Sequence, residues 1–110
     1  MTPHPIPHPT PTMNCQDTLN QLHQALQILA QAQIERNRAK EALELARATA
    51  LISGVLGGRN AEEREAQART SLAAEYERLN HAEETLILAK ARAEIARAAF
   101  ECSLHQKEQA

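Results

Sequence analysis

Residues 53–60 read SGVLGGRN, and they separate two long stretches that contain neither glycine nor proline. Inside a helix a proline costs about 3 kcal/mol and a glycine about 1 kcal/mol relative to alanine. The exclusion of both residue types therefore predicts two uninterrupted helices that reverse direction at the glycines. We expect helix 1 over about residues 14–53, a glycine-rich turn over 54–59, and helix 2 over about 60–105.

The expected helix ends carry capping residues. Asn60 is a favoured N-cap, and Glu63 lies three positions later, where its carboxylate can reach back to the amide of Asn60. Helix 1 can begin at Asn14 or at Thr12. At its other end, Gly54 can adopt the left-handed backbone conformation that closes a helix.

Leucine and alanine alternate along one face of each expected helix. Steps of three and four residues through helix 1 give Cys15, Thr18, Leu22, Ala25, Leu29, Ala32, Arg36, Ala39, Leu43, Ala46 and Ala50. The same steps through helix 2 give Ala68, Leu72, Glu75, Leu79, Ala82, Leu86, Ala89, Ala93, Ala96, Phe100 and Ser103. Two heptad seams of this length predict an all-α fold, an antiparallel two-helix coiled-coil hairpin in which large side chains fill the gaps beside small ones.

One charged residue interrupts each seam, Arg36 in helix 1 and Glu75 in helix 2. A reversal near Gly57 would bring the two within about one helical turn of each other, so we predict that they form a register ion pair. Such a pair adds little net stability but penalises slipped registers. The alternative is that both side chains extend outward into solvent.

Other charges lie on the helix surfaces. Within helix 1, Glu35 with Arg38 and Glu44 with Arg47 have the spacing of surface ion pairs. We interpret them as solvated faces of the helix.

Apolar residues also remain outside the two seams. Helix 2 carries Leu88, Ala91, Ile95, Ala98 and Cys102 on a second line, and helix 1 offers Ile28, Ile34, Leu45 and Ile52. A hairpin that buries one stripe per helix leaves this surface uncovered, which predicts a partner. A second copy, giving a four-helix bundle with two-fold symmetry, is the simplest partner. The alternative is that these are ordinary, scattered surface residues.

The candidate protein-binding residues are Val55, Leu56 and Arg59 in the turn and Leu88 and Ile95 on helix 2. The turn has three interpretations: a hinge with Val55 and Leu56 both packed over the end of the hairpin, a docking knob formed by the same two residues exposed at the tip, or an anion site at a helix N-terminus. The anion site is disfavoured because the turn lacks the Lys-Ser/Thr ending of a phosphate loop and acidic residues begin the next helix.

Composition argues against most other function classes. The chain has 12 basic and 14 acidic residues and a formal net charge of -2, so no global field attracts nucleic acid or a membrane surface. A two-helix rod offers no deep pocket for catalysis, and no His or Cys pair has metal-ligand spacing, so we expect no enzyme activity, cofactor or metal. The cysteines, Cys15 and Cys102, both fall near the open end, where a disulfide is conceivable.

The remaining expectations concern location and the N-terminus. No apolar run reaches the roughly 18 residues of a membrane-spanning helix, and the layout of a signal peptide is missing, so we expect a cytoplasmic protein. All five prolines fall within residues 1–13, which we expect to form a disordered tail rich in proline and histidine.

Residues 57–97, GGRNAEEREAQARTSLAAEYERLNHAEETLILAKARAEIAR, resemble the second half of small helical-hairpin proteins encoded by bacteriophages and prophages. The resemblance rests chiefly on Gly58, Arg59, Asn60, Glu63 and Arg64. It implies a phage-encoded accessory protein that acts in the host cytoplasm by binding a host protein.

Together, the residues and the resemblance predict a non-enzymatic module for protein binding or oligomerisation. One alternative is a phage anti-defence protein that inhibits a bacterial immune complex by blocking a protein surface, as anti-CRISPR proteins do. Another alternative is an accessory protein that binds nucleic acid.

Overall fold

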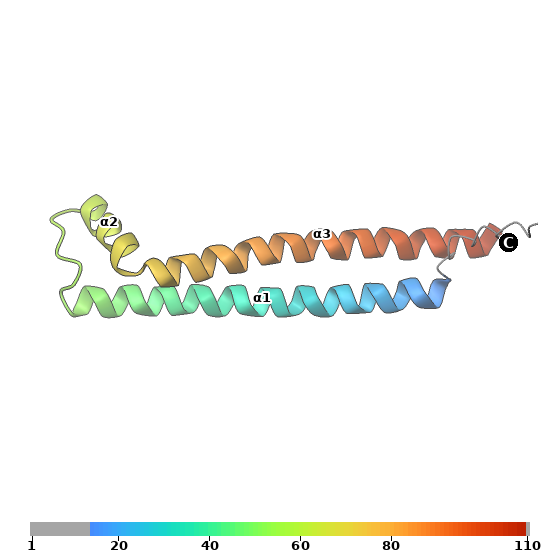
Figure 1. The fold of residues 1–110 in the computed structure, drawn as a ribbon, viewed down its shortest axis with the longest axis horizontal. Helices are drawn as coiled ribbons and strands as arrows, with labels where there is room; N and C mark the ends of the chain where they lie inside the picture. Colours follow the sequence, from blue (N-terminus) through green and yellow to red (C-terminus); the bar gives the residue numbers. More distant parts are fainter. Residues whose placement is uncertain (1–13, 110) are drawn as a thin grey trace, which may run out of the picture.

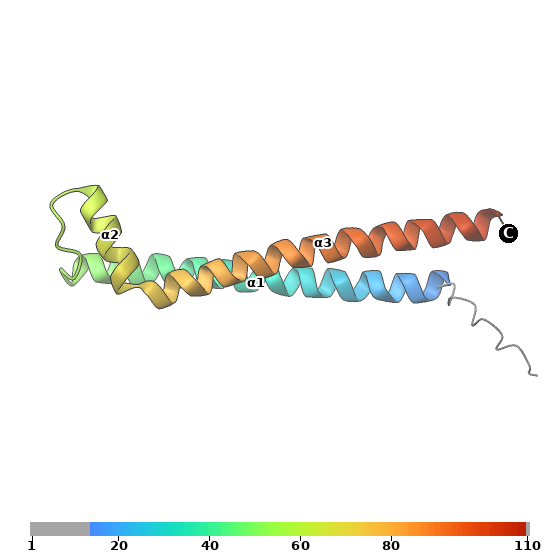
Figure 2. The same ribbon diagram turned by 45° about the horizontal axis from the view of Figure 1, so that its top comes forward.

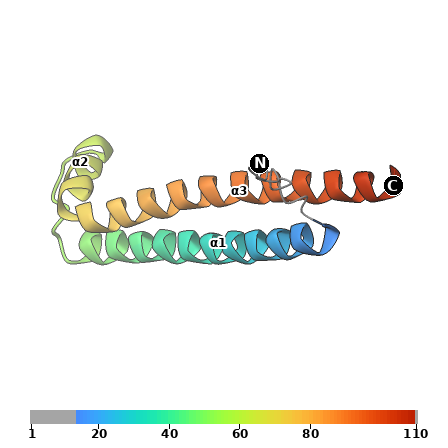
Figure 3. The ribbon, with the colours of Figure 1, turned by 45° about the vertical axis from the view of Figure 1, so that its right-hand side comes forward.

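The computed structural model describes residues 14–109, which form three helices: α1 (Cys15–Ile52), α2 (Ala61–Ser71) and α3 (Ala73–Gln109). The two long helices, α1 and α3, lie side by side and antiparallel (Figure 1). They cross at a shallow angle (Figure 2), and α2 stands across the turn end of the pair (Figure 3). The all-α class is confirmed, and residues 14–109 contain no strand. The expected N-terminal tail lies outside the described residues.

Both ends of α1 follow local chemistry that the sequence predicts. Asn14 is the N-cap, because its Oδ1 accepts a hydrogen bond of 2.8 Å from the amide three residues later. At the other end, Gly54 has a φ of 78°, which a residue with a side chain rarely adopts. The amide of Val55 then donates to the carbonyl of Ala50 at 3.1 Å and so satisfies one of the last free carbonyls of the helix.

The start of α2 is also capped. Asn60 Oδ1 accepts from the amide of Glu63 at 2.9 Å, and Glu63 Oε2 accepts from the amide of Arg59 at 2.8 Å. The carboxylate thus reaches one residue further back than the expected amide of Asn60. Gly58 lies against this first turn so closely that a Cβ there would be 2.7 Å from the amide nitrogen of Arg64. The position therefore requires glycine.

The single helix expected over residues 60–105 is wrong, because the chain bends at Leu72, where φ is -113° and ψ is 32°. No glycine or proline marks the bend, so the sequence carries no local signal for it. Packing supplies the reason: the bend lets Ala68 and Leu56 cluster with Ala50 over the end of α1. Here tertiary contacts override helix propensity. Beyond the bend, α3 continues to Gln109.

The two predicted seams are confirmed as the interface, since every seam residue is buried or partly buried. Alanine dominates this interface; the buried apolar residues of the described chain are Ala25, Ala32, Ala39, Leu43, Ala50, Leu56, Ala68, Ala82, Ala89, Ala93 and Ala96. At the open end the seam contains two buried hydroxyl groups that form a hydrogen bond, with Thr18 Oγ1 2.7 Å from Ser103 Oγ. The core is therefore one residue thick and runs the length of the hairpin.

Candidate functional site

The seam charges Arg36 and Glu75 do not form the predicted register ion pair. Ala25 and Ala93 belong to one buried cluster. Counting from Ala25 to Arg36 on α1, and equally far from Ala93 toward the turn on α3, places Arg36 opposite Ala82. Ala82 is seven residues from Glu75, or about 10 Å along the helix axis. The prediction fails because the point of reversal lies beyond Gly57, displaced by the connection to α2 and the bend that follows it.

A cross-helix ion pair forms instead one position outside the seam. Arg78 donates from Nη2 and Nε to Oε1 of Glu35, at 2.9 Å and 3.2 Å. The expected pairing of Glu35 with Arg38 is therefore not made; the carboxylate joins α1 to α3. About half of each side chain is exposed, so this contact contributes little to the stability of the fold.

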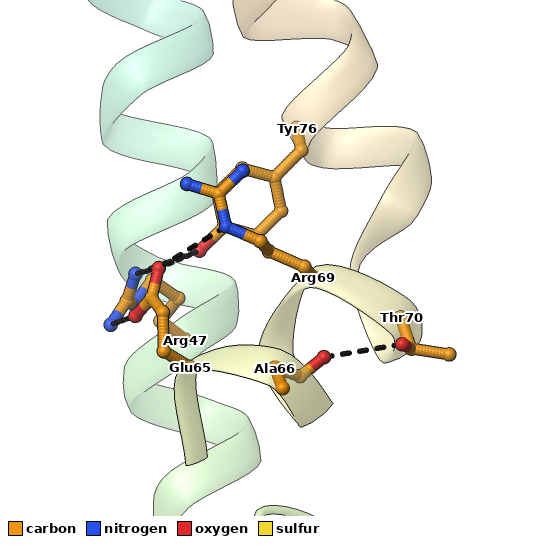
Figure 4. A network of polar contacts seen from close by, with 6 residues as sticks. All are labelled: Arg47, Glu65, Ala66, Arg69, Thr70 and Tyr76. Atoms are coloured by element: carbon orange, nitrogen blue, oxygen red, sulfur yellow. Dashed lines mark hydrogen bonds and ion pairs between the residues drawn. The ribbon is translucent and has the colours of Figure 1, made fainter. Parts of the chain in front are cut away.

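A polar network at the turn end joins all three helices (Figure 4). Arg47 of α1 donates to both carboxylate oxygens of Glu65 on α2, at 2.8 Å and 3.3 Å, and to the hydroxyl of Tyr76 on α3 at 2.7 Å. The guanidinium of Arg69 lies over the ring of Tyr76, 5.1 Å from its centroid. We call these four residues the tip network.

Charge and hydrogen bonding reinforce each other in the tip network. The hydrogen bond from Arg47 lowers the pKa of Glu65, and the same bond raises the pKa of Arg47. The side chains of Arg47 and Glu65 are 42% and 40% exposed, so solvent screens the attraction. The sequence does not indicate this network, because spacing along helix 1 pairs Arg47 with Glu44 instead. The geometry of the network depends on the bend at Leu72, and no local sequence pattern predicts that bend.

The structure separates the turn residues into two kinds. Leu56 is 8% exposed and packs into the core at the end of α1, as the hinge interpretation expects. Val55 is 58% exposed and Arg59 is also exposed, as a docking knob would require. Leu56 also borders an open hollow of about 270 Å³, together with Leu51 and Arg64.

The second apolar line predicted on helix 2 lies on α3, on a face that neither α1 nor α2 covers. Leu88 is 71% exposed and Ile95 is 72% exposed. Ile95 shares an open hollow of about 330 Å³ with Ile28 of α1, and the alanines Ala25, Ala96 and Ala99 also line it. Gln21, Gln24 and Arg92 complete the lining, so the structure brings an off-seam isoleucine of each helix to one mainly apolar depression.

The cysteines are free thiols in this structure. Cys15 is partly buried and its Sγ donates to the carbonyl of Ser103 at 3.3 Å, whereas Cys102 is exposed on α3. Within the described residues no cluster of His, Cys, Asp or Glu could hold a metal ion. The described helices also include none that is long and apolar enough to cross a membrane.

Comparison with protein-family models, curated proteins and solved structures gives no significant match to the chain.

Proposed function

We propose that the hairpin is a non-enzymatic protein-binding module that self-associates through the face bearing Ile28, Leu88 and Ile95. The observation that carries this proposal is the exposure of Leu88 and Ile95 on a helix whose inner seam is already filled. Removing apolar side chains of this size from water contributes about 1.5 to 3 kcal/mol each. Leu88 and Ile95 are one heptad apart on the same line of α3, and Ile95 also borders the hollow, so the two favour a partner.

The thinness of the core supports the same proposal. Among the described residues no large side chain is fully buried, and most of the buried apolar residues are alanines. An alanine side chain buries one methyl group, so the hairpin gains little apolar area for each residue it orders. Packing against a second hairpin would bury the exposed leucines and isoleucines and convert two thin layers into one four-helix core.

The test compares the oligomeric state of the chain with that of variants at the proposed face. Sedimentation equilibrium should show a dimer for the unmodified chain and a monomer for the double variant Leu88→Glu with Ile95→Glu. The matched control is Ile87→Glu, because Ile87 is 65% exposed on the same helix but lies off the heptad line that Leu88 and Ile95 share. Circular dichroism should show that all variants keep their helices.

Two results would contradict the proposal. One is a monomeric unmodified chain at concentrations up to about 1 mM, the weak end of measurable association. The other is an equal loss of association for Ile87→Glu and for the double variant. The anti-defence and nucleic-acid alternatives stay sequence predictions, since no contact or charge pattern of the described residues favours either one.

A further inference from the structure

We infer that the second copy packs its α1 antiparallel against α1 of the first, so that Ile28 lies on Leu45 of the second copy and Glu35 beside its Arg38. The inference rests on the proposed self-association and adds to it which helices meet, their orientation and the register of the dimer.

A second heptad stripe runs along α1 beside the inner seam. Its members are Gln21, Gln24, Ile28, Gln31, Glu35, Arg38, Ala42, Leu45, Thr49 and Ile52. All are exposed except Ala42, which is partly buried. Two hollows lie along this stripe: the depression shared with Ile95 of α3, and an open one of about 350 Å³ lined by Gln31, Ile34, Glu35 and Arg38. The stripe therefore offers knobs and gaps of the kind that helices interlock.

This second stripe of α1, which we call the outer stripe, is complementary to a second copy of itself that runs in the opposite direction. A two-fold axis midway between Glu35 and Arg38 places Glu35 opposite Arg38 of the second copy, and Arg38 opposite Glu35 of the second copy. The same axis sets Ile28 opposite Leu45. One register therefore satisfies a pair of opposite charges and a pair of large apolar side chains, each of them twice.

Neighbouring registers do not share this property. A slip of one heptad in one direction puts Ile28 against Arg38 of the second copy. A slip in the other direction puts Glu35 against Leu45. Each slip sets a charged side chain against a large apolar one, and burying a charge without a partner is costly. The stripe thus selects the central register by charge as well as by shape.

The ion-pair geometry within one hairpin leaves the required groups available. Both donors of Arg78 bind Oε1 of Glu35, so Oε2 remains free to accept from a second guanidinium. Arg38 makes no hydrogen bond or ion pair with any residue between 14 and 109. A second copy in the inferred register brings this free arginine to that free carboxylate oxygen.

The apolar pair fits the hollow. Leu45 is 70% exposed on the same stripe of α1. In the inferred dimer it enters the depression between Ile28 and Ile95, where Ala25 and Ala96 leave room beside them. Two helices with contact strips about 45 Å long and about 10 Å wide would bury on the order of 450 Å² per copy, or about 900 Å² in total, which is the size of a weak, reversible interface.

The first experiment maps the register by cross-linking full-length chains in which Cys15 and Cys102 are replaced by serine. One batch carries Ile28→Cys and another carries Leu45→Cys, and the two are mixed with a short bis-maleimide. We expect a cross-linked dimer from the mixture. Each batch alone should stay uncross-linked, because equivalent residues then lie about 25 Å apart along α1. The matched control replaces Ile28→Cys with Ile34→Cys, which is exposed on the same helix but lies off the stripe.

The second experiment reverses charge at the axis. Arg38→Glu leaves the pair of Glu35 with Arg78 intact but sets two carboxylates together across the interface, so dimerisation should weaken about tenfold or more. The triple variant Glu35→Arg, Arg38→Glu, Arg78→Glu restores every pair with reversed sign and should recover the association. Arg38→Glu should leave the helix content and melting of the monomer unchanged.

The outcomes separate this inference from the proposed function. A dimeric chain that fails to cross-link position 28 to position 45, or that cross-links each batch to itself, overturns the register and leaves self-association standing. A monomeric chain overturns both. Failure of the triple variant to recover association shows that Arg38 acts by another contact, which also overturns the inferred register.

Discussion

The hairpin consists of a shaft, formed by α1 and α3, and a tip, formed by residues 53–72, and the two are held together differently. In the shaft, buried residues form a continuous seam along the whole contact between α1 and α3. The tip buries only Leu56 and Ala68, and half-exposed side chains of the tip network tie it down. Segments with few buried contacts open at lower free energy than the rest of a protein. We therefore expect the shaft to unfold as one unit and the tip to open locally.

The largest expected effect contrasts one buried leucine from each region. Leu43 is 6% exposed in the shaft, and Leu56 is 8% exposed at the tip. Leu43→Ala should lower the free energy of unfolding by about 3 kcal/mol, because the rigid seam cannot close over the cavity. Leu56→Ala should cost less, because the loop around it can collapse. Chemical denaturation followed by circular dichroism measures both; equal costs would show that tip and shaft are one cooperative unit.

The next effect tests whether backbone contact shapes the tip. Gly58→Ala would place a methyl group 2.7 Å from the amide nitrogen of Arg64, so the start of α2 must shift, at a cost of about 1 to 3 kcal/mol. Gly57→Ala is the control, because its nearest neighbour would be 4.0 Å away. Thermal melts of the two variants should differ clearly. If both variants melt together, the close approach of Gly58 does not position α2.

The shaft and the tip also differ in how much of their structure can be predicted from the sequence. The spacing of leucine and alanine predicts the seam, and the residues left outside it, among them Leu88 and Ile95, are the ones the structure exposes. The caps at Asn14 and Asn60 are local chemistry and are predicted as well. The bend at Leu72 arises from packing between segments distant in sequence, so no spacing predicts it. The pairing of Arg47 with Glu65 and the register of Arg36 both depend on that bend, so the sequence does not predict them either.

A smaller effect is expected at the open end of the shaft, where two hydroxyls replace leucine and alanine. Thr18 is 2% exposed and Ser103 is 7% exposed, and their hydroxyls lie 2.7 Å apart. Ser103→Ala should cost about 1 kcal/mol, since it removes a buried hydrogen bond. The double variant with Thr18→Val should cost no more than the single one, because two apolar groups then face each other. A double-mutant cycle by denaturation measures this coupling, and strictly additive losses would contradict it.

The smallest effect belongs to the tip network and depends on pH. The hydrogen bond from Arg47 lowers the pKa of Glu65 in the folded chain, so its contribution is complete at neutral pH and is lost as pH falls through that lowered pKa. Acid should therefore loosen α2 before it affects the seam, and added salt should act in the same direction. The ring resonances of Tyr76 report the event by NMR, because its hydroxyl binds Arg47. Glu65→Gln should abolish the pH dependence of these resonances; if it persists, another group holds the tip to the shaft.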